Sequence, residues 1–161
     1  MNTFAVKNPE QVGYHMATKL IMFHPEQPIY EVMKSLLKHK ISGAPVINSA
    51  HELVGVISEK DCLRVVTDSV YHNLPAGRVQ DYMTQDNILI LSPQTSIIEA
   101  AQLFLRTHVR RFPVVDKGKV VGVISRSDIL RAAQGWKSNA WSDWKLASDA
   151  NANSWFNIHS T

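Results

Sequence analysis

Two aspartates occupy the same place in two nearly identical stretches of the sequence. Residues 55–64 read GVISEKDCLR and residues 122–131 read GVISRSDILR, so seven of ten positions agree. In each stretch an apolar run ends at a serine, and an aspartate, Asp61 or Asp128, follows three residues later. An ionised carboxylate accepts hydrogen bonds at two oxygens, which suits the vicinal hydroxyls of a ribose, and a nearby helix N-terminus favours a phosphate. Each aspartate could therefore bind a ribose.

The same Ser-x-x-Asp pattern also has an interpretation that needs no ligand. Ser58 and Ser125 stand where a strand is expected to end and a helix to begin, and a serine followed by an acidic residue in the first turn is typical of a helix N-cap. Because Asp is shorter than the Glu commoner in a capping box, we expect it to reach back less well and to be freer to face a cleft. Both interpretations stay open, since a duplicated fold also duplicates its caps.

These stretches belong to an internal repeat that fills most of residues 12–133. Val12-x-x-x-Met16 recurs as Val79-x-x-x-Met83 at an offset of 67, and residues 24–48 align with residues 92–116 at an offset of 68. A segment with Pro and Gly but no periodicity separates the copies. The expected organisation is a lead-in (1–11), a first repeat (12–66), a linker (67–78), a second repeat (79–133) and a tail (134–161).

Each copy is expected to contain the same elements in the same order. An apolar strand leads through a proline turn into a helix whose apolar positions follow the i, i+3, i+4, i+7, i+8 spacing from Ile29 and from Ile97. Two short β-rich runs then form a hairpin, and a second helix follows each serine. The predicted fold is α/β, of the α+β type, with two β-α-β-β-α units packed about a pseudo-twofold axis, because one unit cannot cover its own apolar sheet face. Such packing creates two related clefts.

The order of these features resembles the cystathionine β-synthase (CBS) domain, and the tandem copies resemble the CBS pair, or Bateman module. The second copy carries the resemblance most clearly, in HVRRFPVVD followed by GVISRSDILR. The resemblance implies the β-α-β-β-α fold and a regulatory, non-catalytic module that binds AMP, ADP, ATP or S-adenosylmethionine and passes that state to a partner protein. Such modules commonly pair, so a homodimer through the apolar helices 61–66 and 128–133 is also implied.

The resemblance further implies roles for individual residues. The ribose would be bound by Ser58 and Asp61 in one cleft and by Ser125 and Asp128 in the other. The adenine would lie against the backbone of Ala44 and Phe112 and against segments around Thr18, Leu20, Asn87 and Ile88. The phosphate would be bound by basic side chains, which are His108, Arg110, Arg111 and Arg126 near the second site and, more weakly, Lys40 and Lys60 near the first.

The two copies differ at the positions just before the strand proline. The first copy has Ser42 and Gly43 where the second has Arg110 and Arg111. If only one cleft is occupied, we therefore expect it to be the cleft around Asp128. Each cleft could also borrow basic residues from the opposite copy, and a solvated loop corner is an equally good interpretation of the two arginines.

No catalytic or metal-binding pattern is found in the sequence. His51 to Gly55 begins like H-E-x-x-H but ends in glycine, the seven histidines lack ligand spacing, and there is no Walker loop, G-x-G-x-x-G or G-x-S-x-G. The net charge of +3 comes from dispersed basic residues, so nucleic-acid binding is a minor alternative. Neither a signal peptide nor a membrane-spanning run is seen, and we expect a cytoplasmic protein.

The sequence also supports predictions for the two ends of the chain and for its single cysteine. All four tryptophans lie after residue 135, and we expect them to pack on the module or on a dimer interface. The functional alternative is a scaffold with degenerate clefts that docks an unidentified protein partner through this tail. Asn8 and Pro9 are expected to begin a short helix, and Cys62 is expected to be a packed thiol.

Overall fold

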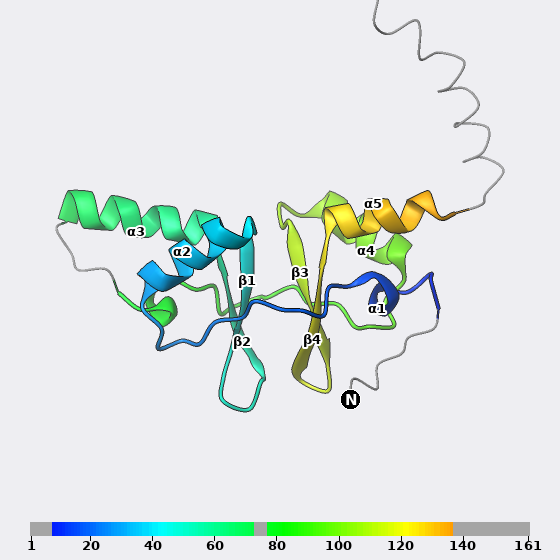
Figure 1. Cartoon of the computed structure of the whole chain (residues 1–161), viewed down its shortest axis with the longest axis horizontal. Helices are drawn as coiled ribbons and strands as arrows, with labels where there is room; N and C mark the ends of the chain where they lie inside the picture. Colours follow the sequence, from blue (N-terminus) through cyan, green and yellow to red (C-terminus); the bar gives the residue numbers. More distant parts are fainter. Residues whose placement is uncertain (1–7, 73–76, 137–161) are drawn as a thin grey trace, which may run out of the picture.

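The computed structural model describes residues 8–72 and 77–136, which form two units side by side (Figure 1). Each unit contains a helix, a β-hairpin and a second helix, so the α+β class with two equivalent units is confirmed. Short helices α1 (Val12–His15) and η1 (Val79–Asp81) precede them. The first unit is built from α2 (Ile29–His39), β1 (Gly43–Ile47), β2 (Leu53–Ser58) and α3 (Glu59–His72), and the second from α4 (Ile97–Arg106), β3 (Arg111–Asp116), β4 (Lys119–Ser125) and α5 (Arg126–Gln134).

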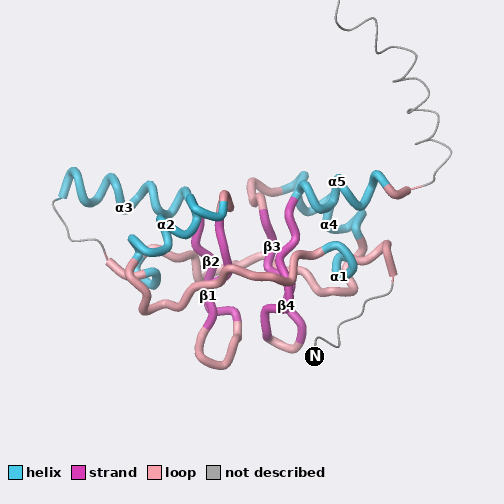
Figure 2. The backbone as a smooth tube through the Cα atoms, in the orientation of Figure 1, coloured by secondary structure: helices cyan, strands magenta, loops and turns pink. Residues whose placement is uncertain are grey.

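The two hairpins lie next to each other in the middle of the molecule, with the helices on the outside (Figure 2). β1 pairs with β2 and β3 with β4, both antiparallel, at equivalent registers that place Ala44 opposite Ile57 and Phe112 opposite Ile124. β1 also contacts β3, so the hairpins meet across the boundary between the units. Each hairpin thus helps to cover apolar surface that the other could not cover alone.

The first β element of each unit is a single bridge and not the full strand that the sequence predicts. Phe23 N–H donates to the Pro45 carbonyl at 3.0 Å, and Ile47 N–H donates to the Phe23 carbonyl at 2.8 Å, in parallel pairing. The next bonds on either side would need an N–H from Pro25 and from Pro45, which proline lacks. The aligned prolines of the second unit limit the bridge at Leu91 in the same way. The prolines that recur in both repeats therefore limit each parallel pairing to a single bridge.

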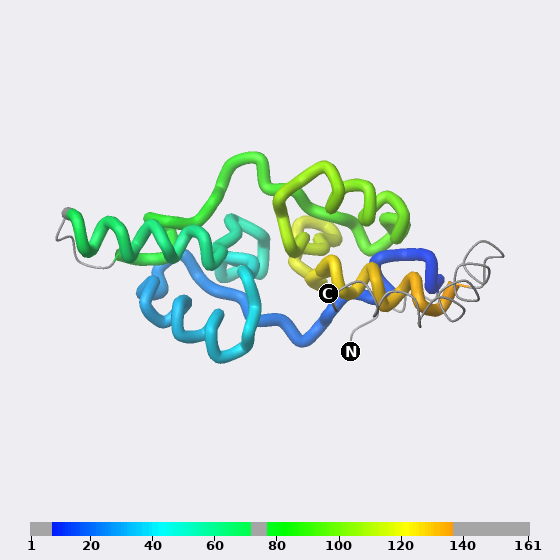
Figure 3. Tube along the Cα trace, turned by 90° about the horizontal axis from the view of Figure 1, so that it is seen from above, coloured from blue at the N-terminus to red at the C-terminus, as the bar shows by residue number. Residues whose placement is uncertain are grey.

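The leading segment of each repeat packs in the unit formed by the other repeat. Val12 and Met16 belong to the buried core of the second unit. Val79 and Met83 join the core of the first unit. Figure 3 shows the two connecting segments, blue and green, passing between the halves of the molecule. The structural units therefore differ from the sequence repeats 12–66 and 79–133 by an exchange of their first helical turns.

Two glycines of the repeated stretches make this exchange possible. A Cβ added at Gly122 would lie 2.7 Å from Met16 Cγ, and one added at Gly55 would lie 2.6 Å from Met83 Sδ. These separations are far below van der Waals contact, so either alanine would push the methionine off the strand. The glycine of G-V-I-S thus leaves room for the crossing methionine of the other repeat.

Two helix boundaries differ from expectation. The lead-in helix begins at Val12 and not at Pro9; Asn8 Oδ1 instead accepts a hydrogen bond from Glu10 N–H at 3.0 Å and caps a preceding turn. α3 continues to His72, inside the expected linker 67–78, because no proline or glycine interrupts it before Pro75.

Of the four tryptophans, the structure describes only Trp136. Trp136 is partly buried against the core of the second unit, as expected for packing on the module. The other three tryptophans of the expected tail lie outside the described residues. Cys62 is buried in the core of the first unit, as expected.

Candidate functional site

A pocket of about 820 Å³ lies between the two units and is lined by both. The first unit contributes the start of β1 and the corner where β2 passes into α3. The other wall comes from residues 84–89, in the segment that connects the first unit to the second, and from the loop 108–111, which leads into β3. Pockets of this size accommodate small-molecule ligands. The two repeats therefore share one candidate binding site.

Ser58 and Asp61 form the polar corner of this pocket. Asp61 Oδ2 accepts hydrogen bonds from Ser58 N–H at 2.8 Å and from Ser58 Oγ–H at 2.6 Å, while Asp61 N–H donates to Ser58 Oγ at 3.3 Å. This is a reciprocal capping box at the start of α3. The side chain of Asp61 is 13% exposed and lines the pocket. Asp61 thus caps the helix and faces the pocket at the same time.

Arg64 engages the second carboxylate oxygen of Asp61. Arg64 Nη2 lies 2.8 Å from Asp61 Oδ1 and also donates to the Tyr82 carbonyl at 2.7 Å. A carboxylate oxygen has two lone pairs, so Oδ1 can still accept one further hydrogen bond. Arg64 is not among the predicted site residues, although its position three residues after Asp61 and its recurrence as Arg131 are a usable signal.

The equivalent corner of the second repeat has the same internal bonding. Asp128 Oδ2 accepts from Ser125 N–H at 2.7 Å and from Ser125 Oγ–H at 2.6 Å, and Arg131 pairs with Asp128 Oδ1. The expectation that the aspartate reaches back poorly is wrong, because one oxygen accepts from the serine N–H and Oγ–H while the other pairs with the arginine. Ser125 and Asp128 are not part of the lining of the 820 Å³ pocket.

Three basic residues that the sequence assigns to the second site lie in the pocket that contains Asp61. His108, Arg110 and Arg111 line it, and Lys60 lies on the opposite wall. The sequence-based assignment grouped these arginines with Asp128. In the structure the loop before β3 faces the corner between β2 and α3 of the other unit, because the hairpins meet across the pseudo-twofold arrangement. In this pocket, the aspartate and the arginines come from different repeats.

Arg126 bonds to the backbone of this loop and is not among the residues that line the pocket. Its Nη2 donates to the Val109 carbonyl at 3.0 Å and lies 3.4 Å from the Thr107 carbonyl. These carbonyls flank His108, at the start of the basic loop. The prediction that Arg126 contacts a phosphate near Asp128 stays a prediction, and in the structure its Nη2 is directed at this backbone.

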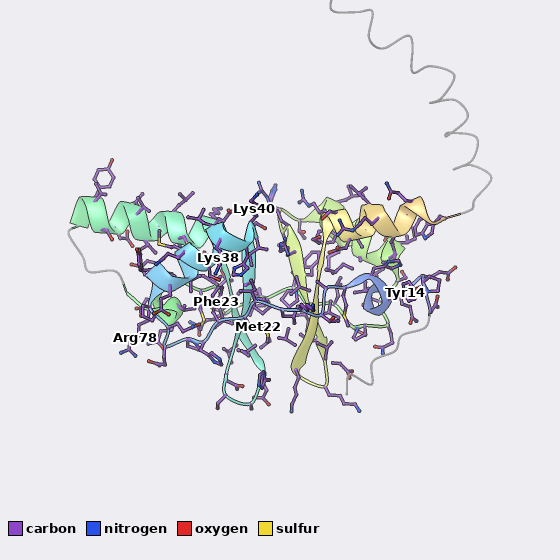
Figure 4. All side chains as sticks on the ribbon, viewed as in Figure 1. Tyr14, Met22, Phe23, Lys38, Lys40 and Arg78 are labelled. Carbon is purple, nitrogen blue, oxygen red and sulfur yellow. The ribbon has the colours of Figure 1, made fainter. Side chains whose placement is uncertain are left out.

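The remaining predicted site residues divide between the pocket and other places. Ala44, Asn87 and Ile88 line the pocket. Phe112 is fully buried and packs on Phe104 with a centroid separation of 4.5 Å, so its side chain belongs to the core. Thr18, Leu20 and Lys40 are not in this lining. Figure 4 shows Lys40 at the inner upper end of the first unit, after α2. Met22 and Phe23 lie lower, on the segment that leads from α1 into the first unit.

Cys62 lies next to Asp61 but points into the core. Burial raises the pKa of its thiol, and the nearby Asp61 and Glu59 carboxylates raise it further. The thiol therefore keeps its proton at neutral pH, where a thiolate nucleophile would need the opposite shift. Cys62 is thus a packed side chain of the first unit's core.

The described parts of the chain contain neither a metal-ligand cluster nor a membrane-spanning helix. Across residues 8–72 and 77–136, no group of three or more His, Cys, Asp or Glu side chains is placed to hold a metal ion. None of the helices within these ranges has the length and hydrophobicity that a bilayer span requires.

Comparison with known proteins identifies the family. The family model of the CBS domain matches residues 10–68 and 79–135. Protein MJ1225 of Methanocaldococcus jannaschii is 29% identical over 122 residues, a match that covers 76% of this chain but only 42% of that protein.

Solved structures agree with this comparison. The crystal structure of CBSX2 from Arabidopsis thaliana in complex with AMP is 32% identical, with a TM-score of 0.69 over 77% of this chain and 96% of that one. The CBS domain pair of protein MJ0100, in complex with 5′-methylthioadenosine and S-adenosyl-L-methionine, is 26% identical, with a TM-score of 0.65 over 79% of this chain and 98% of that one. The chain described here belongs to the CBS domain family, as a tandem CBS pair.

Proposed function

We propose that this protein is a regulatory module that binds an adenosine-containing ligand, an adenine nucleotide or S-adenosylmethionine, in the pocket between its repeats. The observation that carries the proposal is the placement of the Asp61 carboxylate and of a basic loop, 108–111, in the lining of the same pocket. The complexes of CBSX2 with AMP and of MJ0100 with S-adenosyl-L-methionine support it.

The pocket offers each part of such a ligand a suitable surface. Asp61 Oδ1 and the Ser58 hydroxyl would bind the two ribose hydroxyls, with Ser58 Oγ–H turning from Asp61 to the ligand. Ile88 and Leu89 supply apolar surface for the base beside the backbone of Ala44. The adenine would therefore lie between residues 84–89 and β1, with the 5′ substituent directed toward the loop 108–111.

Binding would act on a partner by changing shape or assembly. A ligand held by both repeats fixes their relative position, which either repeat alone cannot do. A homodimer is part of the proposal, because α3 exposes an apolar stripe and α5 exposes Leu130, which is 68% accessible. The stripe consists of Leu63, Val66 and Val70. The partner protein and the cytoplasmic location stay predictions.

Thermal unfolding against a ligand panel tests the proposal. The panel contains AMP, ADP, ATP, S-adenosylmethionine and the guanine nucleotides, added to protein freed of co-purified nucleotide. A ligand present at about one hundred times its Kd stabilises the folded state by about 2.7 kcal/mol, which raises Tm by roughly 5–10 °C for a chain of this size. A rise with adenosine compounds alone supports the proposal. No rise with any of them contradicts it.

A further inference from the structure

The inference below rests on the proposed function and narrows its ligand class. We propose that the pocket selects a phosphorylated adenosine such as AMP and discriminates against S-adenosylmethionine. Both ligands share the adenosine group that Asp61 and Ser58 would bind. They differ at the 5′ position, where AMP carries a dianionic phosphate and S-adenosylmethionine carries a positively charged sulfonium.

The ionisable side chains that line the pocket are predominantly cationic. Those with fixed charge are Lys60, Arg64, Arg110 and Arg111 on the positive side and Glu59 and Asp61 on the negative side, with His108 as an additional basic group. Since Arg64 pairs with Asp61, the uncompensated positive charge lies mainly on the wall formed by the second repeat. A sulfonium would be repelled there, whereas a phosphate would be attracted.

Arg110 and Arg111 are available to a ligand. Among residues 8–72 and 77–136, no carboxylate forms an ion pair with either arginine, whereas Arg64, Arg78 and Arg131 each have one. Arg111 is half-buried and Arg110 is exposed, so the pair reaches from the pocket interior to its rim. A guanidinium presents a planar set of donors that matches phosphate oxygens. The pair therefore forms a basic surface in the same pocket as Asp61.

Arg126 holds this surface in place. Its bond to the Val109 carbonyl fixes the backbone one residue before Arg110. The first repeat has Glu59 at the equivalent position and Ser42 and Gly43 at the equivalents of the arginines. The basic loop and the residue that positions it therefore occur together in the second repeat and are both missing from the first.

The test compares three ligands by isothermal titration calorimetry of the full chain. We expect wild-type protein to bind AMP at least about tenfold more tightly than adenosine, and adenosine more tightly than S-adenosylmethionine. In the double variant Arg110→Gln/Arg111→Gln the affinity for AMP should fall to that of adenosine, while the affinity for adenosine stays within about twofold of wild type. Added salt should weaken AMP binding and leave adenosine binding unchanged, because screening acts on the phosphate.

A matched control and a positioning variant sharpen the test. Lys34→Gln/Lys38→Gln removes the same charge from α2, outside the pocket lining, and should leave the preference for AMP over adenosine unchanged. Arg126→Gln should reduce that preference without lowering adenosine affinity, a change that general destabilisation would not produce. Circular dichroism and Tm of each variant establish that it is folded.

The possible failures are distinguishable. Equal affinity for AMP, adenosine and S-adenosylmethionine overturns this inference and leaves the proposed function standing, as does an AMP affinity that the double arginine variant does not change. Tighter binding of S-adenosylmethionine than of AMP also overturns it. An absence of binding by all three ligands overturns the proposed function together with this inference.

Discussion

The two Ser-x-x-Asp corners are nearly identical in bonding, whereas the loops that face them differ in charge. Both aspartates close a capping box, pair with an arginine three residues later, and have side chains that are 13% exposed. The loop opposite Asp61 carries His108, Arg110 and Arg111. The aligned residues in the first repeat are Lys40, Ser42 and Gly43. The duplicated residues thus have the same bonding in both repeats, and under the proposed function the residues that are not duplicated would determine what each side binds.

The largest expected effect concerns ligand affinity at the two aspartates. Asp61→Ala should weaken AMP binding by about tenfold to a hundredfold, because it removes charge-assisted hydrogen bonds worth about 1.5–3 kcal/mol. Asp128→Ala removes the same group from the corner outside the 820 Å³ pocket and should change AMP affinity less than twofold. Titration calorimetry of both variants measures the difference. The reverse order of effects would move the site to the second corner.

The next effect concerns stability and separates the two glycines. Gly122→Ala should lower the free energy of unfolding by about 1–3 kcal/mol through overpacking against Met16. Gly55→Ala should cost less, because beyond Met83 Sδ at 2.6 Å its new Cβ would meet no atom nearer than 3.2 Å, whereas at Gly122 the Cγ and Cβ of Met16 lie at 2.7 and 3.1 Å. Urea unfolding measures both. In a Met16→Ala background the cost of Gly122→Ala should shrink, and an unchanged cost would exclude this contact as the cause.

A smaller effect should be equal in the two repeats. Ser58→Ala and Ser125→Ala each remove one N-cap, so each should lower the free energy of unfolding by about 1 kcal/mol. The comparison uses urea unfolding without ligand. Costs that differ by more than about 1 kcal/mol would show that the corners are not energetically equivalent, despite their matching hydrogen bonds.

The smallest effect concerns Cys62, which aligns with Ile129. The folded pKa of this thiol is raised above its ordinary value of 9.0, so above that pH the folded chain keeps a proton that the unfolded chain has lost. Its contribution to stability is therefore complete below pH 9 and is lost as the pH rises through the folded pKa. Cys62→Val should remove this alkaline loss. Unfolding curves of both proteins between pH 7 and about 10.5 test it, and parallel curves would contradict it.

The sequence predicts the parts of the fold that repeat. Helical spacing from Ile29 and Ile97 places α2 and α4, and the serines mark the starts of α3 and α5. The exchange of Met16 and Met83 between units could not be predicted, because local spacing does not say which copy of a hairpin a segment will cover. The extent of the first strand was overestimated for a reason already present in the sequence, namely the proline positions.

The sequence predicts the types of residue in the candidate site, but it does not predict which residues of the two repeats come together there. Asp61, Arg110 and Arg111 were each singled out, yet the arginines were grouped with Asp128, their neighbour within the same repeat. Which repeat a loop faces depends on how the hairpins pack, and this is a tertiary property. Arg126 illustrates the same limit, because only the structure shows that its guanidinium is bonded to the Val109 carbonyl.

A crystal structure of the full chain with AMP tests the central claim most directly. The account predicts AMP in the pocket between the repeats, with its ribose hydroxyls on Asp61 and its phosphate against Arg110 and Arg111. AMP bound only at Asp128, or in the Asp61 pocket with its phosphate directed away from both arginines, would contradict the account.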